Sequence, residues 1–197
     1  MLKNVNLLVL MYKTINLPFQ KKLMHRLILV VFVISILGFI GCKKDVGGVS
    51  SAAAVKAQAV KDDQVIQAFI KANNLTGFKS AFTNKDSVAL GGLYYQIVKD
   101  TADATIYSSS TLVTVGYTGR VLPADTVFTQ TNSFHPSFTL GEVIRGWSLC
   151  IPYCNKGGAI RILMASRFAY GPYEQPTYGL KPNSVLDFTI NIYDVTN

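Results

Sequence analysis

Between residue 90 and the C-terminus, several stretches have an apolar residue at every second position, and this alternation narrows the possible folds more than any other feature. The clearest run is residues 186–192, where four large apolar side chains alternate with polar ones. A period of two places successive side chains on opposite faces of a strand, so this run predicts an antiparallel strand with one buried face. Further runs of this kind span residues 93–98, 112–122 and 159–164.

Helical patterns are few. Residues 142–154 form the only plausible helix between the expected strands. Apolar residues at helical spacing after an acidic pair predict a helix of about three turns within residues 62–73, which packs on the domain or on a partner chain. The Ala-rich residues 52–60 fit either a frayed helix or a linker. We therefore expect an α+β domain in which a twisted antiparallel sheet folds against one short α-helix.

The N-terminal residues have the features of an export signal. A basic flank precedes residues 27–40, in which Ser35 is the only polar residue. A spanning helix needs about 20 apolar residues, so this shorter stretch fits the core of a signal peptide. The end of this stretch, with the next two residues, forms the string FIGC at 39–42. This string resembles a bacterial lipobox, which implies cleavage before Cys42 and diacylation of its thiol. The alternative is a permanent anchor helix, and both place the domain at a membrane outside the cytoplasm.

These features divide the chain into four parts. We expect a signal peptide in residues 1–41, of which 1–23 precede a second candidate start at Met24. A lipidated Cys42 and flexible linker follow in 42–61, then a short helix and loop in 62–89 and the main domain in 90–197.

The net charge of +8 comes largely from the N-terminal segment. Residues 1–41 hold five of the 19 basic residues and no acidic one, so the rest of the chain has 14 basic and 11 acidic residues, a net charge of +3. Because those 14 are not clustered, we expect no nucleic-acid partner.

The usual catalytic motifs are missing after Cys42. His135 is the one histidine there, no Gly-x-Ser-x-Gly turn presents a serine, and no Gly-rich loop opens a helix. We therefore expect no metal site and no cofactor. Cys150 and Cys154 are four residues apart, which on a helix separates their Cβ atoms by about 5–6 Å. A disulfide needs roughly 3.5–4.5 Å and would be strained here, so we expect two small buried residues, with a disulfide bridge as the alternative.

Aromatic residues are concentrated around Trp147 in the expected fold. They exceed what a core of this size needs, which predicts an aromatic cleft for an apolar ligand. The set comprises Tyr117, Phe128, Phe134, Phe138, Phe168, Tyr170, Tyr173, Tyr178 and Phe188.

Several motifs occur in a recognisable order: VGYTG at 115–119, EVIRGW at 142–147, FAYG at 168–171 and LKPNS at 180–184. Together they resemble the FKBP-type peptidyl-prolyl cis-trans isomerases over about residues 90–195. With the lipobox, the chain is similar to the lipoprotein form of this family in Bacteroidetes. The resemblance implies an FKBP-like fold, a sheet half-wrapped around a short helix with a hydrophobic cleft between them.

The same resemblance implies roles for individual residues. Trp147 would form the cleft floor, while the Ile144 N–H and the Tyr170 hydroxyl would bind carbonyls of a proline-containing polypeptide. The residues implied in catalysis are Tyr117, Phe128, Ile144, Trp147, Tyr170 and Phe188. The additional substrate contacts are Phe138, Val143 and Leu180.

The sequence also departs from the family pattern. Thr129 follows Phe128 where many active members have an acid, and the Pro-containing residues 171–179 form a loop expected to overhang the cleft. Two hypotheses remain. One is an isomerase acting on exported proteins, lipid-anchored at the outer membrane of a Gram-negative bacterium on its periplasmic face or at the cell surface. The other is a weak or inactive relative that serves as a protein-binding or chaperone module.

Overall fold

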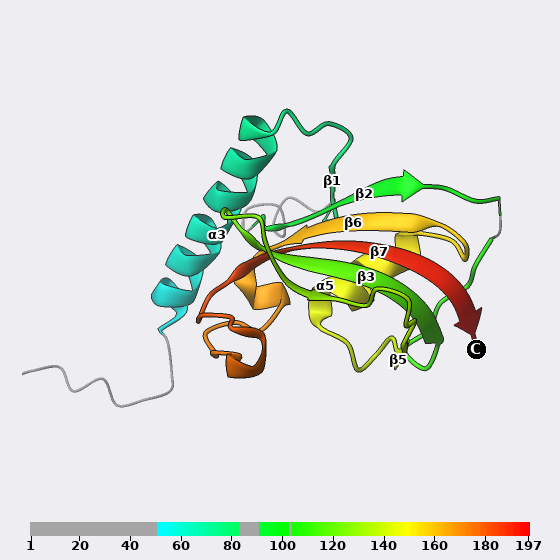
Figure 1. Ribbon diagram of the computed structural model, residues 1–197. Coiled ribbons are helices and arrows are strands. Elements are labelled where there is room, and N and C mark those ends of the chain that lie inside the picture. Colours follow the sequence, from blue (N-terminus) through cyan, green and yellow to red (C-terminus); the bar gives the residue numbers. More distant parts are fainter. Residues whose placement is uncertain (1–50, 83–90, 103) are drawn as a thin grey trace, which may run out of the picture. The chain divides into compact units, whose positions relative to one another are not determined.

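The computed structural model describes residues 51–82, 91–102 and 104–197 (Figure 1). Ser50–Asn197 form one compact unit. The expected export signal, the expected lipidation site at Cys42 and the first part of the expected linker lie outside the described residues. In the described part, no helix is long and apolar enough to cross a membrane.

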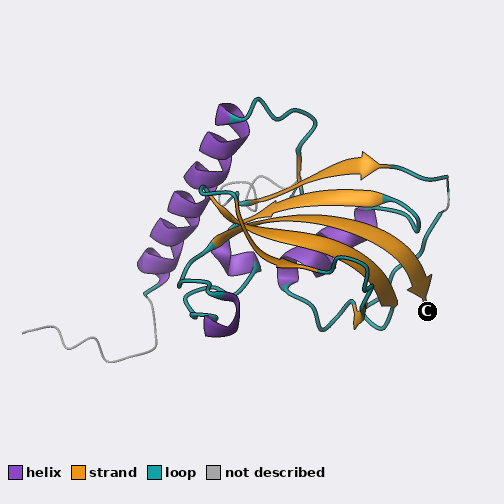
Figure 2. Ribbon diagram, in the orientation of Figure 1, coloured by secondary structure: helices purple, strands orange, loops and turns teal. Residues whose placement is uncertain are grey.

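Seven strands pair in antiparallel fashion to form one twisted sheet, coloured orange in Figure 2. Their order is β1-β2-β6-β7-β3-β4, and β5 pairs with β3 beside this path. The strands are β1 (Lys79–Ser80), β2 (Leu93–Lys99), β3 (Leu112–Leu122), β4 (Thr126–Gln130), β5 (Ser137–Thr139), β6 (Ala159–Met164) and β7 (Val185–Thr196). The expected antiparallel sheet is confirmed, while β1, β4 and β5 are short additions that the alternation did not predict.

Strand β7 lies near the middle of the sheet, between β6 and β3. Its alternating apolar residues at 186–192 are all buried, as the period of two predicts. Phe188 pairs with Ile162 of β6 on one side and with Gly119 of β3 on the other. Because Phe188 lines the cleft described below, its side chain lies on the face of the sheet that forms the cleft.

The helix between the strands, α5 (Arg145–Cys150), is shorter than residues 142–154. Ile144 has ψ 145°, which is extended backbone, so the helix begins only after it. Pro152 lacks an N–H, and the chain continues as the 3₁₀ helix η1 (Ile151–Tyr153). Cys150 and Cys154 are both free and buried, as expected. Burial raises the pKa of their thiols to about 12 and about 11 respectively.

The N-terminal helix, α3 (Ala52–Ala72), is longer than expected because the Ala-rich residues 52–60 belong to it. Ser51 caps its first turn by accepting a hydrogen bond from the Ala54 N–H at 3.2 Å. The buried residues of α3 follow at spacings of three and four, so one line of the helix faces the domain. They are Ala59, Asp62, Ile66 and Phe69.

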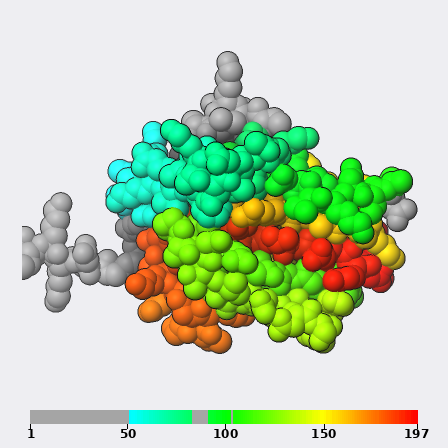
Figure 3. Space-filling model, turned by 45° about the horizontal axis from the view of Figure 1, so that its top comes forward, coloured from blue at the N-terminus to red at the C-terminus, as the bar shows by residue number. Residues whose placement is uncertain are grey.

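Helices α3 and α5 pack on opposite faces of the sheet. Met164 of β6 lies against Gly146 of α5, since a Cβ at Gly146 would stand 2.7 Å from the Met164 sulfur. Arg161, three residues earlier on β6, points the other way, and its guanidinium lies 5.9 Å from the centre of the Phe69 ring of α3. Of the two packing alternatives, the structure therefore has α3 on its own domain. In Figure 3, α3 covers one end of this face, and atoms of β7 (red) remain visible beyond it.

Candidate functional site

A cleft of about 510 Å³ opens between α5 and the sheet, within the size range of small-ligand sites. Most of its lining is apolar or aromatic, with a few hydroxyl groups at its rim. The lining residues are Leu112, Tyr117, Phe128, Thr129, Ser137, Phe138, Thr139, Glu142, Val143, Ile144, Trp147, Tyr170, Tyr178 and Phe188.

Trp147 forms the floor of the cleft and is 5% exposed. Its ring centre lies 5.1 Å from those of Tyr117 and Phe188 and 6.0 Å from that of Phe138. All three neighbours meet it edge to face, the geometry that aromatic pairs prefer. Its buried Nε1–H has no hydrogen-bond acceptor among the described residues. The floor is thus an aromatic surface held in place by three neighbouring rings.

Gly119 of β3 allows one wall of the cleft to close up. A Cβ built on this glycine would lie 2.6 Å from Phe188, 2.8 Å from Thr129 and 2.9 Å from Phe128. Such distances are far below a normal contact, so only a residue without a side chain fits between these three. The glycine of the YTG string therefore shapes the cleft through the space that it leaves.

Two groups at the cleft can donate hydrogen bonds to a ligand. Ile144 precedes the first turn of α5, and its backbone N–H has no acceptor among the described residues. The Tyr170 hydroxyl is likewise unpaired within the described part of the chain. Burial, and then the neighbouring Tyr178 and Tyr117, raise the pKa of Tyr170 above its usual 10.0. The hydroxyl therefore keeps its proton at neutral pH.

The structure brings eight of the nine sequence-predicted site residues to the lining of this cleft. They are Tyr117, Phe128, Phe138, Val143, Ile144, Trp147, Tyr170 and Phe188. Leu180 does not line it. Leu180 is 2% exposed in the core, and its backbone exchanges two hydrogen bonds with Gln175 at 2.9 and 3.1 Å. The loop between residues 171 and 179 instead places Tyr178 at the wall, 6.1 Å from Phe128 between ring centres.

Three of the aromatic residues grouped with Trp147 lie elsewhere. Phe134 and Tyr173 are each 72% exposed and outside the cleft lining. Phe168 is buried with Arg145 and Arg167 near its ring, 5.9 and 4.7 Å from its centre. The aromatic count therefore predicted a cleft correctly but overstated its members.

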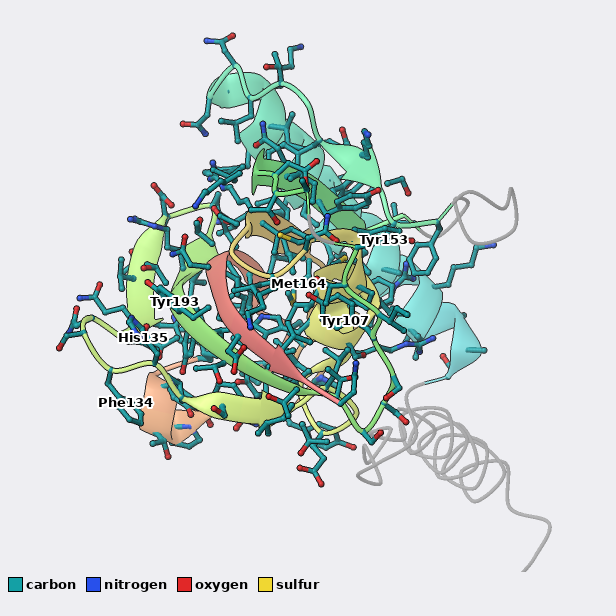
Figure 4. The ribbon with its side chains drawn as sticks, turned by 90° about the vertical axis from the view of Figure 1, so that its right-hand side faces the viewer. Tyr107, Phe134, His135, Tyr153, Met164 and Tyr193 are labelled. Carbon is teal, nitrogen blue, oxygen red and sulfur yellow. The ribbon has the colours of Figure 1, made fainter. Side chains whose placement is uncertain are left out.

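His135 is also remote from the cleft lining. Its ring stacks on that of Tyr193 with 3.8 Å between the centres (Figure 4). Among the described residues, no group of three or more His, Cys, Asp or Glu could hold a metal ion.

The rim contains polar residues that the sequence did not predict as site residues. Glu142 is the one charged residue of the lining, and it forms no ion pair within the described ranges. Ser137 and Thr139 come from the short strand β5, whose three residues carry too weak a pattern to be recognised.

Thr129, noted in the sequence as a departure from the family pattern, lines the cleft beside Phe128. The position where many family members have an acid is therefore uncharged here.

Comparisons with known proteins converge on one family. The family model of the FKBP-type peptidyl-prolyl cis-trans isomerases matches residues 104–193. The chain is 34% identical over 107 residues to FkpA of Escherichia coli K12, covering 53% of this chain and 38% of that protein. It is 32% identical over 95 residues to FK506-binding protein 1 of Saccharomyces cerevisiae, covering 47% of this chain and 82% of that protein.

Solved structures agree with the sequence matches. The crystal structure of FkpA from Escherichia coli superposes with a TM-score of 0.56 at 27% identity, covering 73% of this chain and 65% of that one. A peptidyl-prolyl cis-trans isomerase from Pseudomonas syringae shares the fold at 20% identity and a TM-score of 0.55, covering 76% of this chain and all of that one. The chain matches less than half of the length of FkpA as a sequence.

Proposed function

The chain belongs to the FKBP-type peptidyl-prolyl cis-trans isomerase family, and we propose that it isomerises X-Pro bonds of exported proteins while anchored to a membrane through Cys42. The single observation that best supports catalysis is the floor of the cleft. There the rings of Tyr117, Phe138 and Phe188 pack edge to face with Trp147 and hold the indole in place, so that it offers an apolar contact to a proline ring.

No covalent bond is made or broken in the reaction, so binding alone can supply the catalysis. Partial double-bond character gives an ordinary peptide bond a barrier of about 18–20 kcal/mol. An X-Pro bond therefore takes tens to hundreds of seconds to isomerise unaided. A cleft that binds the twisted amide more tightly than either planar form lowers this barrier.

The chemistry of the cleft favours the twisted form. Twisting removes amide resonance, so the carbonyl oxygen carries less negative charge than in the planar bond. Water hydrogen-bonds the planar form better, and an aromatic site such as that around Trp147 takes this advantage away. The Ile144 N–H and the Tyr170 hydroxyl would hold carbonyls of the peptide on either side, which fixes the bond over the floor.

A peptide isomerisation assay on the full chain in detergent tests the proposal, with two tyrosine variants compared. Tyr170→Phe removes the hydroxyl at the cleft, and the loss of one hydrogen bond to the substrate should lower kcat/KM about tenfold. Tyr173→Phe removes a hydroxyl three residues away, outside the cleft and 72% exposed, and should leave kcat/KM unchanged. Equal activity of the two variants, or no turnover by the wild type, would contradict the proposal.

Membrane anchoring rests on the sequence alone. A lipobox cysteine would be acylated in a Gram-negative host, so radioactive palmitate should label the wild type and not a Cys42→Ala variant. Cys150→Ala is the matched control, because Cys150 is buried in the domain and should not carry lipid. Label on Cys42→Ala, or none on the wild type, would show that the domain is not held by this lipid. Fractionation of the labelled cells would test the expected outer-membrane location.

A specific observation favours the second candidate function, a binding or chaperone module. Thr129 lines the cleft without a charge where many family members have an acid. Under this alternative, proline-containing peptides would bind near Trp147 without being turned over. The chain has one tryptophan, so its fluorescence reports such binding directly.

A further inference from the structure

A buried carboxylate links helix α3 to the turn that carries the cleft residue Tyr170. Asp62 is 2% exposed in the middle of the helix. Its Oδ2 accepts hydrogen bonds from the backbone N–H of Ser166 at 2.9 Å and from the Ser166 hydroxyl at 2.6 Å. Its Oδ1 accepts a third from Nε2 of Gln58 at 2.7 Å. Asp62 lies before residues 104–193, the part that the family model matches.

Ser166 in turn fixes the backbone around Tyr170. Its carbonyl accepts hydrogen bonds from the N–H of Ala169 at 2.9 Å and of Gly171 at 2.8 Å, the two neighbours of Tyr170. The carbonyl of Gly171 accepts another from the N–H of Asn183 at 2.8 Å. Tyr170 is therefore held between two residues that share one anchor, and that anchor is held by Asp62.

The energetics of burial make this link strong. A carboxyl group taken out of water is costly unless it is hydrogen-bonded, and Asp62 accepts three hydrogen bonds. Removing Asp62 would leave both the N–H and the hydroxyl of Ser166 without their acceptor in a buried place. The turn that carries Tyr170 would then rearrange or loosen.

We propose that Asp62 is a positioning residue for the cleft: through Ser166 it sets the place of the Tyr170 hydroxyl, so helix α3 is part of the functional unit. The inference rests on the proposed function, since it concerns the same cleft. It extends that function to a helix that lies outside the residues matched by the family model.

The neighbouring residue provides a matched control. Asp63 also ties α3 to the sheet, because its Oδ1 accepts hydrogen bonds from the Gly92 N–H at 2.8 Å and the Tyr94 hydroxyl at 2.7 Å. These partners lie at the start of β2 and not in the turn that holds Tyr170. Loss of either carboxylate should weaken the attachment of the helix, but only loss of Asp62 should disturb Tyr170.

The experiment compares Asp62→Ala and Asp63→Ala in the full chain, at a temperature where near-ultraviolet circular dichroism shows both folded. Asp62→Ala should lower kcat/KM on the order of tenfold, and Asp63→Ala should leave it within about twofold of the wild type. Asp62→Asn, which keeps an oxygen acceptor, should recover part of the loss. If Asp62→Ala does not fold, Ser166→Ala removes only the hydroxyl partner and should show a smaller loss of the same kind.

A double-mutant cycle separates positioning from a general structural effect. In the Tyr170→Phe background the hydroxyl is already gone, so Asp62→Ala should have little further effect on kcat/KM. The inference is overturned if the double variant loses as much kcat/KM as the losses of Asp62→Ala and Tyr170→Phe multiplied together. It is also overturned if Asp62→Ala and Asp63→Ala lose activity equally. If the wild type shows no turnover, the proposed function fails, and the same cycle is measured as the Kd of a proline-containing peptide from Trp147 fluorescence. If the effects of Asp62→Ala and Tyr170→Phe on that Kd are independent of each other, the inference is overturned as well.

Discussion

Replacing Gly119 by alanine should damage the cleft although none of its aromatic side chains is removed. The added methyl would stand within 2.9 Å of Phe188, Thr129 and Phe128. Phe188 is 3% exposed on a central strand and cannot move away, so the two residues of β4 must shift outward. Overpacking of this kind costs about 1–3 kcal/mol. The Tm should then fall by roughly 2–12 °C, at about 2–4 °C for each kcal/mol.

Gly116 on the same strand is the control for this prediction. A Cβ there meets the ring edge of Tyr193 at 2.9 Å and His135 at 3.3 Å, on the opposite face of the sheet. Tyr193 is 49% exposed, so its ring can swing aside and the change should cost less than about 1 kcal/mol. We expect Gly119→Ala to lower kcat/KM about tenfold and Gly116→Ala to retain it. Thermal unfolding and the isomerisation assay would refute the reasoning if both variants behaved alike.

Three further predictions follow from the described residues. Leu180→Ala should lower the free energy of unfolding by about 2–5 kcal/mol in thermal or urea denaturation and leave the peptide affinity of the folded protein unchanged. A weaker affinity would show that Leu180 contributes to peptide binding. Peptides with Lys beside proline should be turned over faster than those with Glu, and Glu142→Gln or high salt should remove that preference; a preference that survives would come from another group. Burial raises the pKa of the Cys150 thiol from 9.0, and chiefly burial raises that of Tyr94 from 10.0, both to about 12. The unfolded chain therefore loses these protons first, so the free energy of unfolding should fall as pH rises from about 9 to 12, and it should fall less steeply in Cys150→Ala. Urea denaturation at several pH values measures this fall, and an equal fall in Cys150→Ala and the wild type would contradict the prediction.

The strands were the most predictable part of the molecule. In β7 the apolar residues of the 186–192 run are all buried, as a period of two requires, although Val185 and Asp187 on the alternate positions are buried too. Short strands such as β5 hold three residues, too few for any period to be seen. The helix before β6 was expected to be longer because its sequence does not show that Ile144 stays extended.

Helix α3 shows why other parts of the structure could not be predicted from the sequence. Its N-terminal half has Val55 and Val60 about half exposed, so no apolar stripe distinguishes it from a linker. The burial of Asp62 depends on Ser166, 104 residues later in the chain, and no local pattern contains that information. The cleft residues were predicted by the order of motifs, which fixes positions in strands and helices well. It failed at Leu180, which follows a loop that departs from the family pattern.

The central claim is that the surface of Trp147 catalyses rotation about X-Pro bonds. The most direct test is kcat/KM of the full chain on an X-Pro peptide, measured beside Trp147→Ala. The account predicts turnover well above the uncatalysed rate in the wild type, and its loss in Trp147→Ala while circular dichroism shows the sheet intact. Turnover that persists without the indole, or a folded wild type that leaves the peptide at its uncatalysed rate, would contradict it.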